Sequence, residues 1–111
     1  MNLPTEVFGD VAVVHAPDEL GSDQAGPFLS FLRGLTQTSV VLDLDGSESL
    51  DSAGLAALLD AQERLQQSQG DLKIAATNPL NRKILEITRL DRQLDVFESV
   101  IDAVKSFRTR S

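Results

Sequence analysis

The segment from Val40 to Leu59, VVLDLDGSESLDSAGLAALL, contains the pattern that decides the fold. Val40 to Leu44 is a nearly continuous apolar run, which is typical of a strand that is buried on both faces of a sheet. A short loop from 45 to 50 follows. The next helix begins at Asp51 or Ser52, since either side-chain oxygen can accept a hydrogen bond from a free N–H group of the first turn.

Strands and helices alternate on both sides of this segment. Apolar runs at Glu6–Phe8 and Val11–His15, separated by Gly9 and Asp10, predict a tight β-hairpin. Two further strands are expected at Leu72–Ala76 and, shorter, near Leu94–Val96. This order, with strands alternating with helices after a hairpin, predicts parallel pairing through right-handed crossovers. The predicted fold is an α/β mixed sheet, an opening antiparallel hairpin plus parallel strands, covered by about four helices.

Each expected helix has its own signals. The first begins near Ser22, with its regular part starting late and Pro27 in the first turn. The second runs to about Gln69 and ends at Gly70 as its C′ glycine. For the third, Asn78 is the N-cap and Pro79 the first helical residue. Helical spacing places these apolar residues on inner faces: Leu80, Ile84 and Ile87 in the third helix, and Phe97, Val100, Ile101, Val104 and Phe107 in the last.

Composition excludes several classes of function. The 111 residues suffice for one domain, residues 1–111, with its own core. The chain has no Cys and one His, which argues against disulfides, a cysteine nucleophile, a His-based triad and a metal site. No signal peptide and no apolar run of about 20 residues is present, so a cytoplasmic protein without membrane insertion is expected. The net charge of −7 disfavours nucleic acid and anionic membranes and favours a protein partner.

Ser52 has two interpretations. It can cap the helix, which is the commonest use of a serine at such a position. It can also accept a phosphate, because the amides of the first turn and the helix dipole favour an anion there. The small residues Ala53 and Gly54 would leave room for the backbone of another protein. The residues alone favour the capping role.

The DSAGL stretch from Asp51 to Leu55 resembles the signature of STAS domains, the family of bacterial anti-sigma factor antagonists. The hairpin, the total length and the tail from Ala76 to Phe107 are also similar to that family. The resemblance implies a non-catalytic signalling protein in which Ser52 is the phosphoacceptor beside Asp51. It implies a partner-facing first turn formed by Ala53, Gly54 and Leu55. The implied partners are an anti-sigma factor with serine kinase activity and a PP2C-type phosphatase, and no cofactor is implied.

Two neighbouring segments are expected near Ser52. Family members carry an acidic residue after the second strand that lies beside the phosphoacceptor, and its nearest equivalents here are Asp18 or Glu19. Asp18 is the candidate for partner binding, although a solvated loop carboxylate is an equal alternative. Thr77 and Asn78 should lie near the Ser52 loop, because the carboxyl ends of parallel strands meet at one end of a sheet. For Asn78, capping the next helix is the more probable role.

Three other functions have partial support in the sequence. Asp43 and Asp45 end a buried strand as in a phosphorelay receiver, but the first strand lacks the acidic pair that holds Mg²⁺, and Lys73 begins its strand instead of ending it. The segment that begins at His15 faintly resembles the active site of the sugar phosphotransferase phosphocarrier, but the Arg that stabilises the phosphohistidine there is missing after His15. Some STAS domains are constitutive docking subunits of lipid-transport ABC ATPases or pieces of stress-signalling scaffolds. A serine at position 52 favours the switch over that alternative.

Overall fold

The computed structural model describes residues 1–108, and for Arg108 only its place in the last helix. The elements follow in the order β1 (Thr5–Phe8), β2 (Val11–His15), β3 (Glu19–Leu20), α1 (Ser22–Arg33), β4 (Ser39–Asp43), β5 (Ser49–Leu50), α2 (Ser52–Gln67), β6 (Asp71–Ala75), α3 (Pro79–Ile87), the 3₁₀ helix η1 (Leu90–Arg92), β7 (Asp95–Phe97) and α4 (Val100–Arg108).

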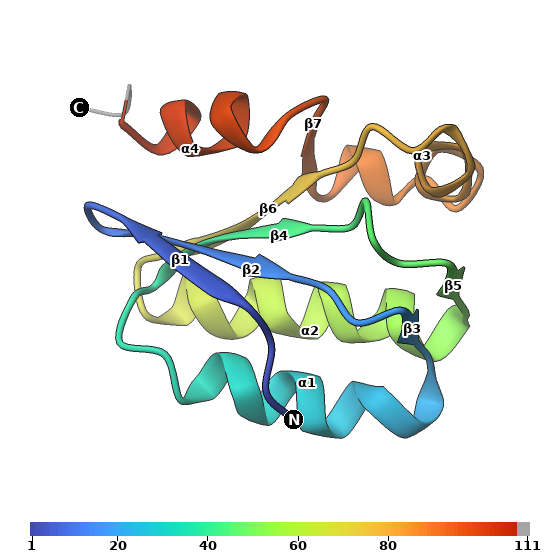
Figure 1. The fold of residues 1–111 in the computed structure, drawn as a ribbon, viewed down its shortest axis with the longest axis horizontal. Coiled ribbons are helices and arrows are strands. Elements are labelled where there is room, and N and C mark those ends of the chain that lie inside the picture. The colour runs from blue at the N-terminus through green and yellow to red at the C-terminus, as the bar shows by residue number, and fades with distance from the viewer. Residues whose placement is uncertain (109–111) are drawn as a thin grey trace.

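The main sheet has five strands in the order β1-β2-β4-β6-β7. The β1–β2 pair is antiparallel and the other pairs are parallel, so the predicted mixed sheet is confirmed. Helices α1 and α2 cover one face, α4 covers part of the other, and α3 lies beyond the carboxyl ends of β4 and β6 (Figure 1). Two-residue strands β3 and β5 form a separate parallel pair that the sequence did not predict.

Both faces of the central strands are buried, as the apolar run in β4 predicts. Val40, Leu42 and Leu44 contribute to the larger cluster, which also contains Phe28 of α1 and Leu58 of α2. On the opposite face, the smaller cluster consists of Val11, Val13, Val41, Ala75, Ala103 and Val104. The alternation of side chains along a strand therefore assigns each valine and leucine of β4 to one cluster or the other. None of the helices within residues 1–108 is long and apolar enough to cross a membrane.

Three helix boundaries differ from the prediction. Helix α1 is already regular at Ser22, and Pro27 lies inside it. Phe97 belongs to β7 and not to the last helix, although it still packs against the smaller cluster. Helix α2 ends at Gln67, and the left-handed residue that follows it is Gln69, with a φ of 65°, and not Gly70. Gly70 is needed for a different reason, because a Cβ atom there would overlap the carbonyl oxygen of Thr38.

The inner face predicted for the third helix is wrong. In α3 the buried residues are Asn81 and Leu85, whereas Leu80 and Ile87 are 67% and 70% exposed. The Asn81 side chain donates hydrogen bonds to two backbone carbonyl oxygens of the β4–β5 loop. These bonds fix the rotation of the helix about its axis, and the apolar stripe faces outward as a result.

Candidate functional site at the start of helix α2

Asp51, and not Ser52, is the N-cap of α2. Its backbone is extended, at φ −107° and ψ −179°, and its Oδ1 accepts a 2.9 Å hydrogen bond from the Gly54 N–H group. Ser52 is the first helical residue and is exposed. Within the part of the chain that the structure describes, the Ser52 hydroxyl has no hydrogen-bond partner. The Ser52 hydroxyl is therefore accessible and is not needed to satisfy the helix end.

Segment 18–21 runs beside the loop that leads into α2. The Asp18 carbonyl accepts from the amides of Glu48 at 2.7 Å and Ser49 at 3.2 Å, and the Leu20 carbonyl accepts from the Asp51 amide at 3.4 Å. Both Asp18 and Glu19 have exposed side chains. The segment with the expected acidic residues therefore contacts the loop before α2 through backbone hydrogen bonds, while the two acidic side chains are exposed.

Two glycines allow these segments to approach. Gly54 is buried, and a Cβ atom at this position would overlap the backbone carbonyl of Leu20. At Gly21 a Cβ atom would lie 2.7 Å from Oδ2 of Asp51. The expectation that Gly54 makes room for a partner's backbone is corrected, because the backbone that fills this space belongs to β3 of the same chain.

The other two residues of the DSAGL stretch are half-buried. Ala53 is partly accessible, and Leu55 packs against the larger core cluster. Within this stretch the exposed residues are Asp51 and Ser52. The accessible surface of the first turn is therefore narrower than the motif alone indicates.

The β4–β5 loop is anchored by two buried polar side chains that sequence reasoning missed. Ser47 is fully buried, and its hydroxyl donates a 2.6 Å hydrogen bond to the Pro17 carbonyl. The Asn81 amide donates to the carbonyls of Leu44 at 2.9 Å and Ser47 at 3.0 Å. Buried polar groups are costly unless they are hydrogen-bonded, so these contacts hold the loop in one conformation.

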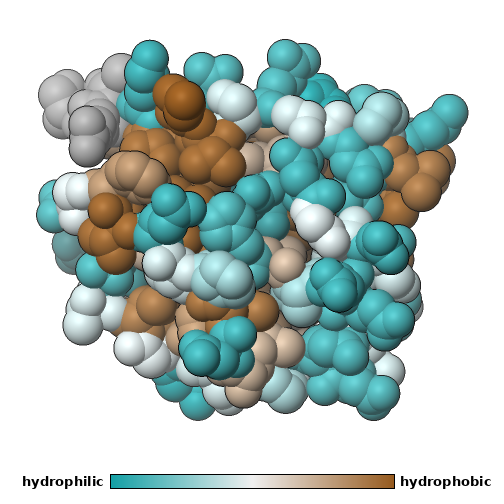
Figure 2. Space-filling view, viewed as in Figure 1, coloured by the Kyte–Doolittle hydropathy of each residue, from teal (hydrophilic) through white to brown (hydrophobic). Residues whose placement is uncertain are grey.

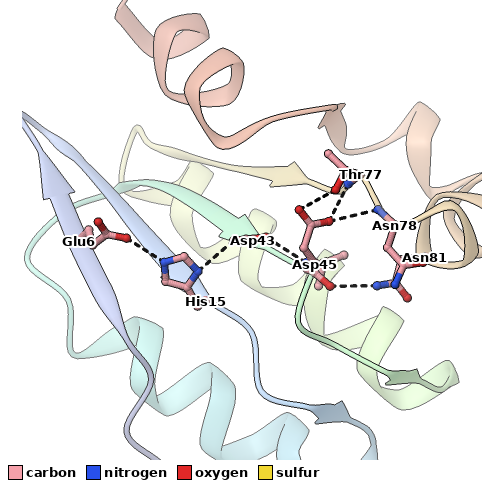
Figure 3. A network of polar contacts seen from close by, with 8 residues as sticks. Glu6, His15, Asp43, Asp45, Thr77, Asn78 and Asn81 are labelled. Atoms are coloured by element: carbon pink, nitrogen blue, oxygen red, sulfur yellow. Dashed lines mark hydrogen bonds and ion pairs between the residues drawn. The ribbon is translucent and has the colours of Figure 1, made fainter.

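Asp45 joins this loop to the Thr77–Asn78 segment (Figure 3). Its carboxylate accepts from the Thr77 amide at 2.7 Å, the Thr77 hydroxyl at 2.9 Å and the Asn78 amide at 3.2 Å. Asn78 in turn caps α3, accepting from the Leu80 amide at 2.9 Å. The structure therefore brings Thr77 and Asn78 to the loop that precedes Ser52, with Asp45 making the contact. The sequence could have indicated this role of Asp45, because Asp45 follows the end of β4 and the carboxyl ends of parallel strands meet at one end of a sheet.

A second polar cluster adjoins Asp45 on the sheet. His15 lies between two carboxylates, with Nε2 2.9 Å from Glu6 Oε1 and Nδ1 3.0 Å from Asp43 Oδ2 (Figure 3). Asp43 Oδ1 also accepts from the Asp45 amide at 2.9 Å. The hydrogen bond with Glu6, followed by the influence of Asp43, raises the pKa of His15 above its ordinary value. No group of three His, Cys, Asp or Glu side chains that could hold a metal ion occurs among residues 1–108.

Known proteins resemble the chain over nearly its whole length. A sequence relative from Thermotoga maritima, named "Putative anti-sigma factor antagonist", is 22% identical and covers 97% of this chain and 99% of its own. The structure of an anti-sigma factor antagonist from Mycobacterium paratuberculosis has a TM-score of 0.84 at 24% identity, covering 96% of this chain and 93% of that one. The anti-sigma factor antagonist SpoIIAA of Bacillus, in its unphosphorylated form, has a TM-score of 0.77 at 15% identity and 99% coverage of both chains.

A family model described as "Mlab, STAS domain" matches residues 6–101. The matched range contains the five-stranded sheet except for the first residue of β1, the whole of α1 to α3, and the start of α4. The chain belongs to the STAS-domain family.

Proposed function

We propose that this protein is an anti-sigma factor antagonist that is switched by phosphorylation of Ser52. The observation that carries the proposal is the division of roles at the start of α2. Asp51 caps the helix, and the exposed Ser52 hydroxyl is free to react. The names of the relatives support the choice of partner, an anti-sigma factor, and the exposure of Ser52 supports its role as the phosphoacceptor.

In the unphosphorylated state, the surface around Ser52 docks on an anti-sigma factor and a sigma factor is released. The proposed contact surface consists of the exposed or half-buried residues of this region, Asp18, Asp51, Ser52, Ala53, Leu55, Thr77 and Asn78. The anti-sigma factor is also a serine kinase. It transfers the γ-phosphoryl group of ATP to Ser52 Oγ, so that a new P–O bond forms, ADP leaves, and the hydroxyl proton passes to a base of the kinase. A PP2C-type phosphatase hydrolyses the phosphoserine and restores the binding state.

Phosphorylation adds a charge of about −1.5 to −2 at neutral pH next to the Asp51 carboxylate. Asp51 already occupies the amide of Gly54, so one first-turn donor is not free to receive the phosphate. In an interface built around a hydroxyl, the added charge is desolvated and repelled by Asp51. Repulsion within the contact surface, without refolding, is the proposed switch.

The test compares the wild type with Ser52→Ala and Ser52→Asp, each purified by affinity from the native host. Intact-mass analysis reports phosphate on the bait. We expect phosphate on the wild type at Ser52, an ATP-binding anti-sigma factor bound to wild type and Ser52→Ala, and loss of that partner with Ser52→Asp. Matched controls are Ser22→Ala and Ser22→Asp, because Ser22 is also the exposed first residue of a helix. Binding by Ser52→Asp as tight as by the wild type would contradict the switch.

A second function is favoured by the family description, which names Mlab beside STAS. The chain would then be a constitutive docking subunit of a lipid-transport ABC ATPase. The same purification distinguishes the two proposals. An unmodified bait that recovers a transporter ATPase, with equal yield from the wild type and Ser52→Asp, would support the docking subunit.

A further inference from the structure

Helix α3 presents an apolar stripe to the outside. Leu80 and Ile87 are 67% and 70% exposed, Ile84 is half-buried, and Lys83 is exposed between them. Their spacing of i, i+3, i+4 and i+7 places them on one side of the helix. Figure 2 shows the resulting apolar patch over α3, at the right of the view. We call Leu80, Lys83, Ile84 and Ile87 the α3 stripe.

The contacts of Asn81 hold this stripe on the outside of the molecule. Single exposed aliphatic side chains are common on protein surfaces, but a helical row of them is the pattern of a face that packs against something. The opposite side of α3 buries a polar residue, Asn81, which is 2% exposed and is fixed by its two hydrogen bonds to the β4–β5 loop. The stripe therefore cannot turn inward without breaking those bonds.

The segment that carries the stripe has a charge opposite in sign to that of the whole chain. Residues 79–93 include four basic side chains, Arg82, Lys83, Arg89 and Arg92, and two acidic ones, Glu86 and Asp91, whereas the whole chain has a net charge of −7. Arg82 forms an ion pair with Glu98, with 3.6 Å between Nη1 of Arg82 and Oε1 of Glu98. Lys83, in the middle of the stripe, has no ion pair within residues 1–108. An apolar row with unpaired positive charge complements an apolar ridge flanked by carboxylates.

We propose that the α3 stripe is a docking surface for an acidic amphipathic helix of a protein partner. Helix-in-groove recognition uses anchors at this same spacing. A membrane is less suited as the occupant, because the stripe contains three aliphatic side chains and no Trp or Phe, and the acidic body of the protein is repelled by anionic lipids. The stripe does not include Ser52, so the proposal does not rest on the phosphorylation switch.

The probe is a synthetic acidic peptide with leucines at i, i+3, i+4 and i+7 and glutamates elsewhere, beside a scrambled peptide of equal composition. Binding to the isotope-labelled protein is followed by NMR chemical shifts. We call the peptide with leucines at these positions the ordered peptide. It should cause saturable chemical-shift changes confined to α3 and η1, and the scrambled peptide should cause none. Leu80→Gln/Ile87→Gln should weaken binding by about tenfold or more, because two apolar contacts are lost. Lys83→Glu should weaken it most at low salt.

The matched control is Ile101→Gln, which removes an aliphatic side chain of similar exposure, 65%, from α4. It should bind the ordered peptide as the wild type does. Shifts centred elsewhere, or equal binding of the scrambled peptide, would overturn the proposal. Two further results would overturn it by naming another occupant: binding to phosphatidylglycerol vesicles, or self-association of the protein, either one abolished by Leu80→Gln/Ile87→Gln.

Discussion

Gly54 and Ser52 are two positions apart at the start of α2 and lie in opposite environments. Ser52 faces outward with a hydroxyl that the fold does not use, and Gly54 faces inward against the Leu20 carbonyl. A sequence motif does not distinguish these roles, since both residues are small and both belong to the same turn. At the residue scale the motif therefore combines one exposed position, the proposed phosphoacceptor, with one position for packing.

Replacing Gly54 by Ala should destabilise the protein. The new Cβ atom would overlap the Leu20 carbonyl, and because the obstacle is backbone, β3 or α2 must shift. Overpacking of this kind costs about 1–3 kcal/mol or more in free energy of unfolding. The matched control is Gly46→Ala in the β4–β5 loop, where nothing lies within 4 Å of the added atom and φ is not positive. That change should alter the free energy of unfolding by less than about 1 kcal/mol, since the added methyl group meets no backbone. Urea denaturation measures both, and equal effects would contradict the packing role of Gly54.

Helix α2 depends on its cap at Asp51. Asp51→Ala removes the acceptor of the Gly54 amide and should cost about 0.5–2 kcal/mol in free energy of unfolding. Ser52→Ala should change stability by less than about 0.5 kcal/mol, because Ser52 is exposed and does not cap. Thermal and urea unfolding of the two variants give the comparison. If Ser52→Ala were the more damaging change, the assignment of Asp51 as the cap would be wrong.

The elements that the sequence predicts are those whose pattern is local. The apolar run of β4 and the capped start of α2 lie where the sequence predicts them, to within a residue. The orientation of α3 could not be predicted in this way, because it depends on Asn81 finding carbonyl partners in a loop more than thirty residues away. Strands β3 and β5 were missed for a similar reason, since two-residue strands have no periodicity of their own.

At the candidate site, the sequence placed Asp51 and Ser52 at a helix start and, by the strand-end rule, Thr77 and Asn78 beside the preceding loop, and the structure has them in these positions. Sequence reasoning interpreted Asp45 only as a receiver-like acid, whereas the structure uses the Asp45 carboxylate to tie the β4–β5 loop to Thr77 and Asn78. The pairing of a carboxylate with backbone amides depends on the path of both loops. That path is set by tertiary packing, which no local pattern records.

Polar contacts connect the opening hairpin to the far end of the molecule. Glu6 and His15 belong to the hairpin, Asp43 ends β4, and Asp45 and Thr77 lie in the loops beyond the carboxyl ends of the parallel strands (Figure 3). Helices α1 and α2 lie on one face of the sheet and α4 on the other, and α3 lies beyond the carboxyl ends of β4 and β6 (Figure 1). The stability of the whole domain should therefore respond to the charge on His15, the one histidine of the chain.

The pKa of His15 is raised, first by Glu6 and then by Asp43, and the direction of this shift determines how the free energy of unfolding changes with pH. A group whose pKa is higher in the folded state stabilises fully below its unfolded pKa, about 6.5 for histidine, and loses that contribution as the pH rises through the folded pKa. The wild type should thus exceed His15→Gln in free energy of unfolding by more at pH about 6 than at pH about 8.5. Because the His15 side chain is partly exposed, solvent screens its ion pairs, and the difference between the two pH values should be modest. Urea denaturation at the two pH values measures it, and Glu6→Gln should reduce the pH dependence of the wild type. An equal gap between wild type and His15→Gln at both pH values would show that the imidazole contributes through packing and not through its charge.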